Sequence, residues 1–365
     1  MIWRIEKRTA ALARPPAWVF PVSLAFAGAA GACIFSALGV SPLAAYGTMA
    51  RGAFGSFYHF SEVVVRAIPL MLTGLAVAVA ATMLLWNIGC EGQLVWGGIF
   101  AAGTGLYLIP HLPPFLAIPA VIAAGAAGGL LWGLIPGLLR AYLAVNEILS
   151  SLLLNYIAII FMEHLYFGPW RNPEGFGFPG TAQIGEAARI PHWFGTRIHL
   201  GLVLALVMAA LVFAALRYTR WGYQVRAIGL NPQAARYAGF RIRGQIVFIM
   251  GLSGALAGLA GMAEVSGIHF RLQQGLAVGY GYDGIIVAWL ARLNPLAVPL
   301  VALLLGALIV GGEQLQSVLH LPASISMVLE AVLLFGLLLS ESLARYRLVR
   351  RAAGEETSAA GKGLP

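Results

Sequence analysis

Charged residues are scarce in this chain of 365 residues. Asp, Glu, Lys and Arg make up 10% of it, whereas they make up about 25% of a typical soluble domain. Long stretches contain none of the four: 15–50, 67–90, 92–139, 198–216 and 244–263. Each stretch holds an apolar run near the ~20 residues that a helix needs to cross a bilayer. The composition therefore excludes a soluble globular protein and indicates a polytopic membrane protein.

The residue patterns of common catalytic and metal sites are also missing. No Walker A sequence, HExxH motif or cluster of histidines occurs. The two cysteines, Cys33 and Cys90, lie in or beside apolar runs, so we expect no disulfide and no metal site. The run 279–284 matches G-x-G-x-x-G but lies between apolar runs instead of in a βαβ unit, which excludes a dinucleotide site. We expect no enzymatic activity and no cofactor bound by this chain.

The basic residues lie mainly at the ends of the apolar runs and give a net charge of +9. No nucleic-acid motif accompanies them, so nucleic acid is not expected as a partner. We predict ten membrane spans: 18–40, 67–86, 94–109, 115–139, 148–168, 198–216, 245–268, 280–291, 296–312 and 325–341. With the N-terminus inside, most of the 23 Lys and Arg residues fall on the inner side, as the positive-inside rule requires. Both termini are therefore expected in the cytoplasm.

These spans divide the chain into three parts. Residues 1–17 form a cytoplasmic N-terminal segment, and residues 18–345 form the transmembrane domain. The first apolar run is too long for a signal peptide and others follow it, so it is expected to remain uncleaved. The domain includes an external loop, 169–197, and a basic cytoplasmic loop, 217–244. Residues 346–365 are expected to be a disordered cytoplasmic tail.

The basic loop contains the signals of a very short helix. Asn231 is a good N-cap, Pro232 fits the first helical position and Gly239 fits the position after the C-cap. Two helical turns do not persist alone in water because helix nucleation is unfavourable. Alanines 234, 235 and 238 would give this helix a small, smooth face. The pattern is typical of a contact site for another protein.

Two groups of polar residues interrupt the apolar background. The first is Asn87, Glu91 and Gln93, between the second and third predicted spans. The third span is about 24 Å long at 1.5 Å per residue, shorter than the ~30 Å hydrocarbon core, so this polar run is expected to dip into the membrane. Backbone at that depth is tolerated where it is buried in protein or lines a wet cavity. The alternative is an ordinary interfacial turn with Glu91 in water.

The second group is Glu147, Ser151 and Asn155, spaced i, i+4, i+8 on one face of the fifth span. Such a stripe either lines a translocation path or supplies interhelical hydrogen bonds, and both alternatives stay open. Glu264 and Glu330, in the seventh and tenth spans, raise the same question. A structural role is favoured for these two.

Several motifs together resemble one family. They are IPLMLTGLAVAVA (68–80), NIGCEGQ (87–93), NEILSSLLLNYIA (146–158), GLNPQAARYAGF (229–240), SGALAGLAG (253–261) and GYGYDGIIVAWLARLNP (279–295). The chain resembles the permease subunits of bacterial ATP-binding-cassette (ABC) importers, in the sugar/nucleoside/branched-chain amino-acid branch. It is most similar to the nucleoside (BMP-lipoprotein-associated) permeases. Residues 81–83 and 291–292 depart from the family pattern.

The resemblance implies an all-α permease domain of about ten transmembrane helices with inverted repeats, in the bacterial plasma (inner) membrane. It implies that residues 229–240 form a coupling helix seated in a cytoplasmic ABC ATPase subunit, where ATP and Mg²⁺ are bound. The residues expected at this contact are Gly229, Asn231, Pro232, Ala234, Ala235, Tyr237 and Gly239. The other implied partners are a second permease chain, in a heterodimer more than a homodimer, and an extracytoplasmic substrate-binding lipoprotein.

The expected function is passage of a nucleoside through the membrane as part of an ATP-driven importer. The residues expected along the pathway are Asn87, Glu91, Gln93, Glu147, Ser151, Asn155 and Asp283. Within the same class, the alternatives are a simple sugar such as ribose and, less favoured, a branched-chain amino acid. A secondary transporter driven by an ion gradient is the alternative from another class. It is disfavoured because paired intramembrane acids and bases for a proton relay are few.

Overall fold

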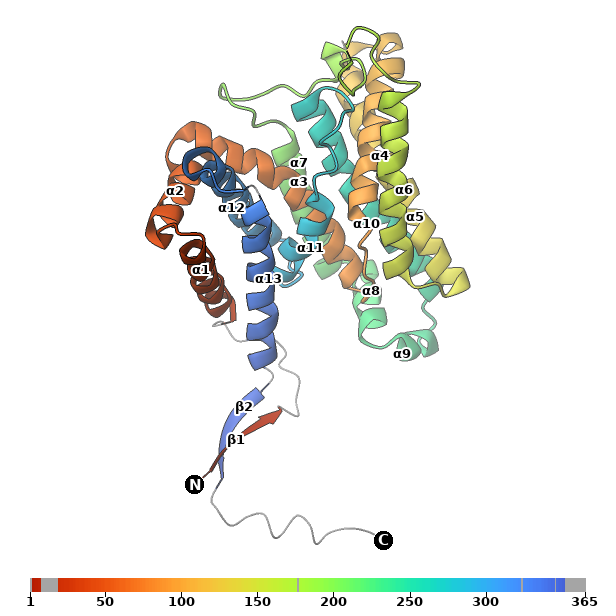
Figure 1. Cartoon of the computed structure of the whole chain (residues 1–365). Helices are drawn as coiled ribbons and strands as arrows, with labels where there is room; N and C mark the ends of the chain where they lie inside the picture. The colour runs from red at the N-terminus through yellow and green to blue at the C-terminus, as the bar shows by residue number, and fades with distance from the viewer. Residues whose placement is uncertain (1, 8–18, 176, 323, 345, 352–365) are drawn as a thin grey trace. The chain divides into compact units, whose positions relative to one another are not determined.

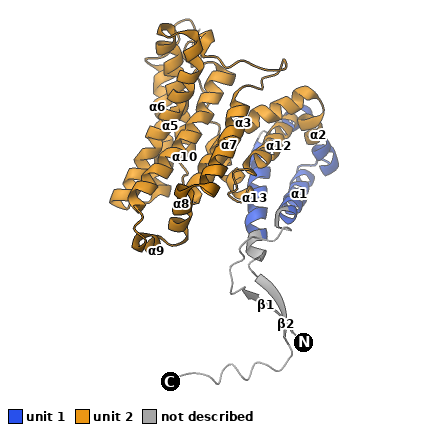
Figure 2. Cartoon of the chain, turned by 180° about the vertical axis from the view of Figure 1, so that it is seen from behind, with its two compact units in different colours: residues 1–47, 315–365 blue, residues 48–314 orange. Residues whose placement is uncertain are grey.

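The computed structural model describes all residues except 1, 8–18, 176, 323, 345 and 352–365 (Figure 1). The chain forms two compact units, residues 1–47 with 315–365 and residues 48–314 (Figure 2). The larger unit holds most of the helices. They are α3 (Phe57–Ala81), α4 (Cys90–Gly103), α5 (Pro114–Leu143), α6 (Glu147–Phe167), α7 (Gly201–Tyr218), α8 (Arg220–Leu230), α9 (Pro232–Tyr237), α10 (Ile242–Glu264), α11 (Tyr280–Leu290) and the greater part of α12 (Val298–Leu319).

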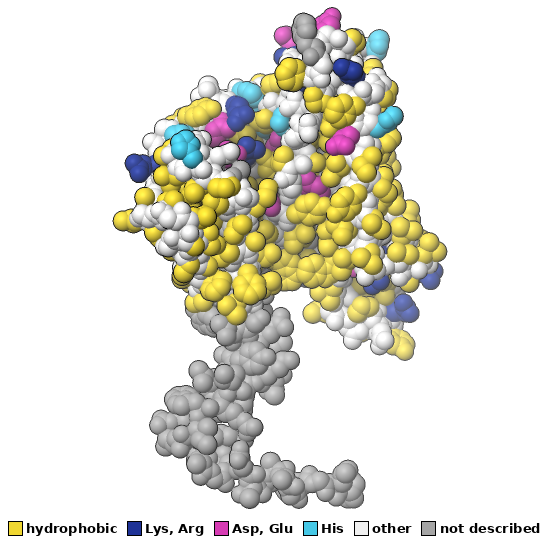
Figure 3. Space-filling view, viewed as in Figure 1, with side chains coloured by type: hydrophobic (Ala, Val, Ile, Leu, Met, Phe, Trp, Pro, Cys, Tyr) yellow, Lys and Arg dark blue, Asp and Glu magenta, His cyan; other side chains and the backbone are white. Residues whose placement is uncertain are grey.

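Two of these helices continue beyond their α-helical part as wider π turns. Residues Thr104–Leu108 extend α4 and lead into a 3-10 turn at Ile109–His111, and Val265–His269 extend α10. A further 3-10 turn, Glu186–Ala188, lies in the external loop. Hydrophobic side chains cover much of the visible surface of the molecule (Figure 3), as expected of helices that face lipid.

The smaller unit is built on α1 (Val19–Ala37) and α13 (Ser324–Ala344). Their side chains meet at two levels: Ser23 and Ser340 share a 2.7 Å hydrogen bond, and the rings of Phe26 and Phe335 lie 6.2 Å apart. Strands β1 (Ile2–Lys7) and β2 (Tyr346–Arg351) pair antiparallel. The start of the predicted tail is therefore a strand, and residues 352–365 lie outside the described residues.

The predicted all-α membrane fold is confirmed, although the number of crossings is not established as ten. Each predicted span contains a helix, but seven helices of the described chain are long and apolar enough to cross a bilayer. Counting α1 with α2 (Pro42–Phe54) as one bent span would make eight. Helix α11 has only 11 residues. Helix α2 was not predicted; it begins at a proline after a turn at Gly39, whose φ is +74°.

The central helices pack closely against one another at glycines. A Cβ atom added at Gly97 of α4 would lie 2.1 Å from the carbonyl oxygen of Gly258 in α10, and one at Gly284 of α11 would lie 2.6 Å from Oγ1 of Thr73 in α3. Helix α4, which follows α3, therefore packs on α10, while α11, which follows α10, packs on α3. This exchange of partners is the arrangement expected of inverted repeats.

Candidate functional site at a buried helix junction

The N-termini of α4 and α11 meet inside the larger unit, each preceded by a non-helical segment (82–89 and 270–279). Glu91, in the first turn of α4, joins them. Its carboxylate accepts hydrogen bonds from the backbone N–H of Gly279 (2.8 Å) and of Gly281 (2.6 Å). The first N–H groups of a helix lack partners within the helix and carry partial positive charge, so a carboxylate there is favourable. Glu91 thus caps α11 from another helix.

Asn87 ties the polar turn to α3 and α10. Its side-chain amide donates 2.8 Å hydrogen bonds to Oε1 of Gln93 and to Oγ of Ser253 in α10. The amide of Gln93 donates in return to Oδ1 of Asn87 over 3.0 Å. The hydroxyl of Ser253 in turn donates a hydrogen bond to the carbonyl oxygen of Ala76 in α3 over 2.6 Å. These bonds fix the turn against two spans.

Asn155 fixes the same turn from α6. Its Oδ1 accepts from the N–H of Gly92 at 2.8 Å, and its amide donates to the carbonyl of Ile88 at 2.9 Å. The same amide reaches the hydroxyl of Tyr282 in α11 at 3.1 Å. A Cβ atom added at Gly89 would lie 2.9 Å from Cβ of Ser151, so the turn and α6 are in close contact there as well.

The other two predicted pathway residues are placed differently. Glu147 forms an ion pair with Nε of Arg140 at 3.2 Å, near the ends of α6 and α5 that face α8 and α9 (Figure 1). The predicted stripe on α6 therefore divides, with two members at the junction and one in an ion pair. Asp283 lies half-buried in the first turn of α11, where an acidic residue is favoured.

The junction is closed to solvent. Asn87, Glu91 and Gln93 are each at most 2% exposed, and Asn155 is 1% exposed. The alternative that Glu91 lies in water is therefore wrong. A buried polar network whose members are bonded to one another holds its elements in one arrangement. In the state that the structure describes, the junction joins α3, α4, α6, α10 and α11 into one rigid group.

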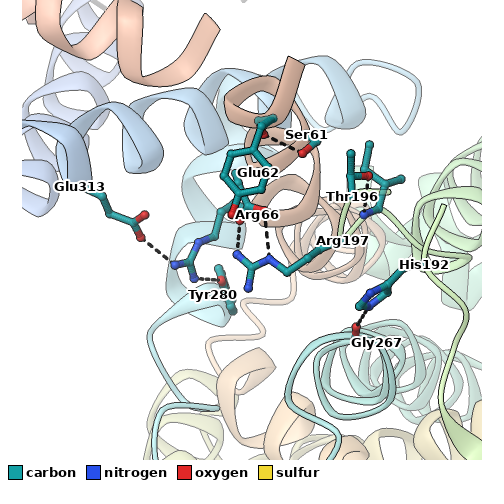
Figure 4. Close-up of polar contacts among 11 residues, drawn as sticks. Ser61, Glu62, Arg66, His192, Thr196, Arg197, Gly267, Tyr280 and Glu313 are labelled. Atoms are coloured by element: carbon teal, nitrogen blue, oxygen red, sulfur yellow. Dashed lines mark hydrogen bonds and ion pairs between the residues drawn. The ribbon is translucent and has the colours of Figure 1, made fainter. Parts of the chain in front are cut away.

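A second polar cluster, which the sequence did not predict, lies along the first half of α3 and reaches the first residue of α11 (Figure 4). The guanidinium of Arg66 donates to the hydroxyl of Tyr280 in α11 at 2.8 Å and forms an ion pair with Glu313 of α12 at 2.7 Å. One turn earlier on α3, Glu62 forms an ion pair with Arg197, which precedes α7. The available sequence signal was the charge of Glu62 and Arg66 at the start of a long apolar run, which does not indicate their partners.

The external loop is fastened to the segment that enters α11. The backbone N–H groups of Thr181, Ile184 and Ile190 donate to the carbonyls of Leu272, Phe270 and Ser266 at 2.8–2.9 Å. These bonds hold the π turn at the end of α10 and the start of the non-helical segment. Within that turn His269 lies 3.5 Å from the carboxylate of Glu264, which gives this predicted structural acid a partner.

Two histidines lie at the end of the external loop, His192 within it and His199 between it and α7. His192 contacts the carbonyl of Gly267 through Nε2 at 2.6 Å (Figure 4), while Nδ1 of His199 accepts from the N–H of Gly201 at 3.1 Å. Burial, and then the neighbouring His192, lower the pKa of His199 to about 4. The neutral imidazole is therefore the form that this contact requires.

The predicted two-turn helix exists as α9. Oδ1 of Asn231 accepts from the N–H groups of Gln233 and Ala234 at 3.0 Å, and Gly239 has φ of +81°, as the predicted caps require. Pro232 is its first residue. Ala235 is buried whereas Ala234 is exposed, so the predicted small face is divided. Tyr237 is 94% exposed and stands out from the surface.

The preceding helix, α8, was not predicted, and it connects α9 to the junction. A Cβ atom added at Gly229 of α8 would lie 2.2 Å from the carbonyl oxygen of Thr82 and 3.3 Å from Cα of Met83. These two residues begin the segment 82–89 that leads into the buried turn. A displacement of α8 and α9 would therefore press directly on the backbone of that segment.

Comparison with known proteins defines the class of protein to which this chain belongs. Residues 59–338 match the family described as branched-chain amino acid transport system / permease component. The match covers most of the chain, and the chain belongs to this family of ABC transporter permeases. It is a multi-pass membrane protein and a transport subunit.

The sequences of several relatives align with this chain along most of their length. A glucose ABC transporter permease of Haloferax volcanii is 35% identical over 91% of each chain. A guanosine ABC transporter permease of Bacillus subtilis is 34% identical over 84% of this chain and 89% of its own. A nucleoside ABC transporter permease of Lactococcus lactis is 30% identical over 86% of this chain and 88% of its own. No solved structure matches the chain significantly.

Proposed function

We propose that this chain forms the translocation pathway for a nucleoside in an ATP-driven importer. The observation that carries the proposal is the similarity, over more than four-fifths of the chain, to the guanosine permease of Bacillus subtilis and the nucleoside permease of Lactococcus lactis. The motifs NIGCEGQ and LNYIA, whose polar side chains meet at the junction, support the same assignment. The membrane is the bacterial plasma (inner) membrane, with both termini in the cytoplasm.

Energy arrives through α9. A cytoplasmic ABC ATPase subunit, which binds ATP and Mg²⁺, receives the exposed side of this helix, including Ala234 and Tyr237. Its motion passes from Gly229 to the segment at Thr82 and so to the junction. Because Glu91 caps α11 from α4, the N-termini of both helices then move together.

The solute passes along helices that the junction holds in place. Their wall includes the predicted residues Asn87, Glu91, Gln93, Ser151, Asn155 and Asp283, with Glu147 at the inner end. The buried network favours a positioning role for most of them, since their hydrogen-bonding groups are engaged with one another in this state.

Two further partners complete the importer. An extracytoplasmic lipoprotein delivers the solute, and a second, related permease pairs with this chain. The pairing is favoured because the chain is similar to two guanosine permeases of Bacillus subtilis, at 34% and 24% identity, and to two nucleoside permeases of Lactococcus lactis, at 30% and 25%. One chain of each kind would form a heterodimer.

A sugar is the second candidate solute. It is favoured by the 35% identity to the glucose permease of Haloferax volcanii over 91% of both chains. The two candidates predict uptake of different labelled solutes.

Uptake of labelled guanosine by cells that carry the complete importer tests both solute and energy source. The account predicts competition by unlabelled nucleosides, little competition by glucose, ribose or leucine, and loss of uptake when ATP is depleted. Absence of guanosine uptake, together with ATP-dependent uptake of labelled glucose by the same cells, would establish the sugar assignment. Uptake that survives ATP depletion but collapses with an ionophore would identify an ion-coupled transporter instead.

A further inference from the structure

A basic pocket lies where α9 meets α10. It has a volume of about 400 Å³ and is lined by Arg236, Phe240, Arg241, Ile242 and Arg243. Three of these five residues are exposed arginines. Figure 3 shows Lys and Arg side chains gathered at the end of the molecule that carries α9.

The arginines of the pocket have no carboxylate beside them in the part of the chain that the structure describes. Among the residues that the structure describes, none of the three forms an ion pair with a carboxylate. Three guanidinium groups around one hollow repel one another unless an anion lies between them. The planar, forked guanidinium matches phosphate oxygens in pairs, so phosphate is the anion that this arrangement suits best. The uncapped N-terminus of α10 adds partial positive charge beside them.

The pocket opens at the level where a membrane ends. The first residue of the span formed by α10 is Ile242, a lining residue. The guanidinium of Arg243 lies 5.8 Å from the ring centre of Tyr142, in the last turn of α5. Tyrosines favour the interface between hydrocarbon and water, and interfacial arginines attract anionic headgroups.

One stripe of α10 leads from the pocket towards the hydrocarbon. Gly244 and Phe248 are spaced i, i+4 and therefore lie on one face of α10, which begins directly after its N-cap residue Arg241. Gly244 has open space where a side chain would project, and Phe248 is 55% exposed. This surface has a charged end followed by an exposed apolar stripe. A lipid has the same sequence of parts, a charged headgroup followed by an apolar acyl chain, and therefore fits it. An acidic protein surface would use the charged end but not the stripe.

We propose that this pocket binds the phosphate headgroup of an anionic phospholipid in the leaflet on the α9 side. Arg236, Arg241 and Arg243 hold the phosphate, and an acyl chain lies along Phe248. Because Arg236 belongs to α9, while Arg241 is the N-cap of α10 and Arg243 lies in its first turn, the lipid steadies α9 against the start of a span. This role goes beyond the proposed transport function and does not depend on the solute.

Native mass spectrometry of the purified full chain tests the proposal directly. Phosphatidylglycerol is compared with phosphatidylcholine of the same acyl chains, on wild type and on the variant R236Q/R241Q/R243Q. A variant with the same change of charge in the same loop but outside the pocket, R217Q/R220Q/R226Q, is the matched control. Each arginine near an anionic lipid surface contributes about fivefold in affinity. The pocket variant should therefore bind phosphatidylglycerol at least about tenfold more weakly than wild type, and the control should bind it as wild type does.

Equal retention of phosphatidylglycerol by the pocket variant and wild type would overturn the proposal. So would displacement of the lipid by millimolar inorganic phosphate alone, which would show a site for free phosphate. Loss of ATPase-subunit binding with unchanged lipid retention would assign the pocket to an acidic protein surface instead. If the triple variant does not fold, the single variant Arg241→Gln is measured, with Arg220→Gln as its control and about fivefold weaker lipid binding expected.

Discussion

The carboxylate of Glu91 accepts a 2.6 Å hydrogen bond from the backbone N–H of Gly281, although the two residues are 190 positions apart in the sequence. The bond joins the first turn of α4 to the first turn of α11, and a second bond to Gly279 strengthens it. A Cβ atom added at Gly281 would lie 2.2 Å from the backbone N of Glu91, so the two backbones are in direct contact. The two halves of the permease meet at this point.

Replacing Glu91 by Gln should lower the maximal rate of uptake about tenfold or more. The new amide can point its NH₂ group at one of two N–H donors, and a lost bond to a charged acceptor is worth about 1.5–3 kcal/mol. The concentration of loaded binding protein that gives half-maximal uptake should stay unchanged, because the residue positions helices. Glu186→Gln, an exposed change in the external loop, is the control and should transport normally. A change confined to half-saturation would instead place Glu91 in contact with the solute.

Asn155→Leu should destabilise the protein by about 2–4 kcal/mol, because it leaves the N–H of Gly92 and the carbonyl of Ile88 buried without partners. Tyr282→Phe removes only the third partner and should cost about 1 kcal/mol. Thermal unfolding of the purified chain in detergent measures both. Equal stability of Asn155→Leu and wild type would show that the network does not hold the junction together.

Gly229→Val should uncouple the importer. Its side chain would meet the carbonyl of Thr82 and push α8 away from the segment that leads to the junction. We expect ATP hydrolysis to continue while uptake falls about tenfold. This fall corresponds to an activation free energy of transport that is about 1.4 kcal/mol higher. Gly28→Ala is the helical control, since a Cβ atom there has nothing within 4 Å. Parallel assays of ATP hydrolysis and uptake separate the two effects. Normal uptake by Gly229→Val would exclude transmission through this contact.

Acidification should loosen the external loop. The pKa of His199 is lowered from 6.5 to about 4 by burial and then by His192. Because the folded protein holds its neutral form, the stabilisation is complete above pH 6.5 and is lost as the pH falls towards 4. At most about 3 kcal/mol is lost in this window.

Hydrogen exchange of residues 181–199 between pH 7 and pH 4, corrected for the intrinsic rate, measures the loosening. His199→Gln should flatten the pH dependence, while a variant of the exposed His111 should keep it. A profile that is the same for wild type and His199→Gln would assign the pH dependence to other groups.

Local signals in the sequence predicted the positions of the apolar helices and of the short helix α9. Runs without charge locate helices because a charged side chain in lipid is costly, and Asn231, Pro232 and Gly239 mark the limits of α9 because caps act on neighbouring residues. Polarity also singled out Asn87, Glu91 and Asn155 as a site. Their partners could not be predicted in this way, because a bond such as that from Gly281 to Glu91 depends on tertiary packing.

The residues that the sequence analysis did not predict are those whose contacts depend on tertiary packing. Arg66, Tyr280 and Glu313 come from three separate helices and meet only in the folded chain. Helix α8 was missed because its arginines and glycines read as a polar loop, whereas tertiary contacts at Gly229 and Trp221 hold it. Propensity is a weak prior where such contacts decide.

The central claim, that ATP-derived energy enters through α9, is tested most directly by Ala234→Trp in the assembled importer. Ala234 is exposed on α9, and an indole there would keep the helix out of a closely fitting groove. The account predicts that the ATPase subunit no longer co-purifies and that ATP-driven guanosine uptake is lost, while Tyr218→Trp, at an exposed position on α7, retains both. ATPase association and uptake that both survive Ala234→Trp would contradict it.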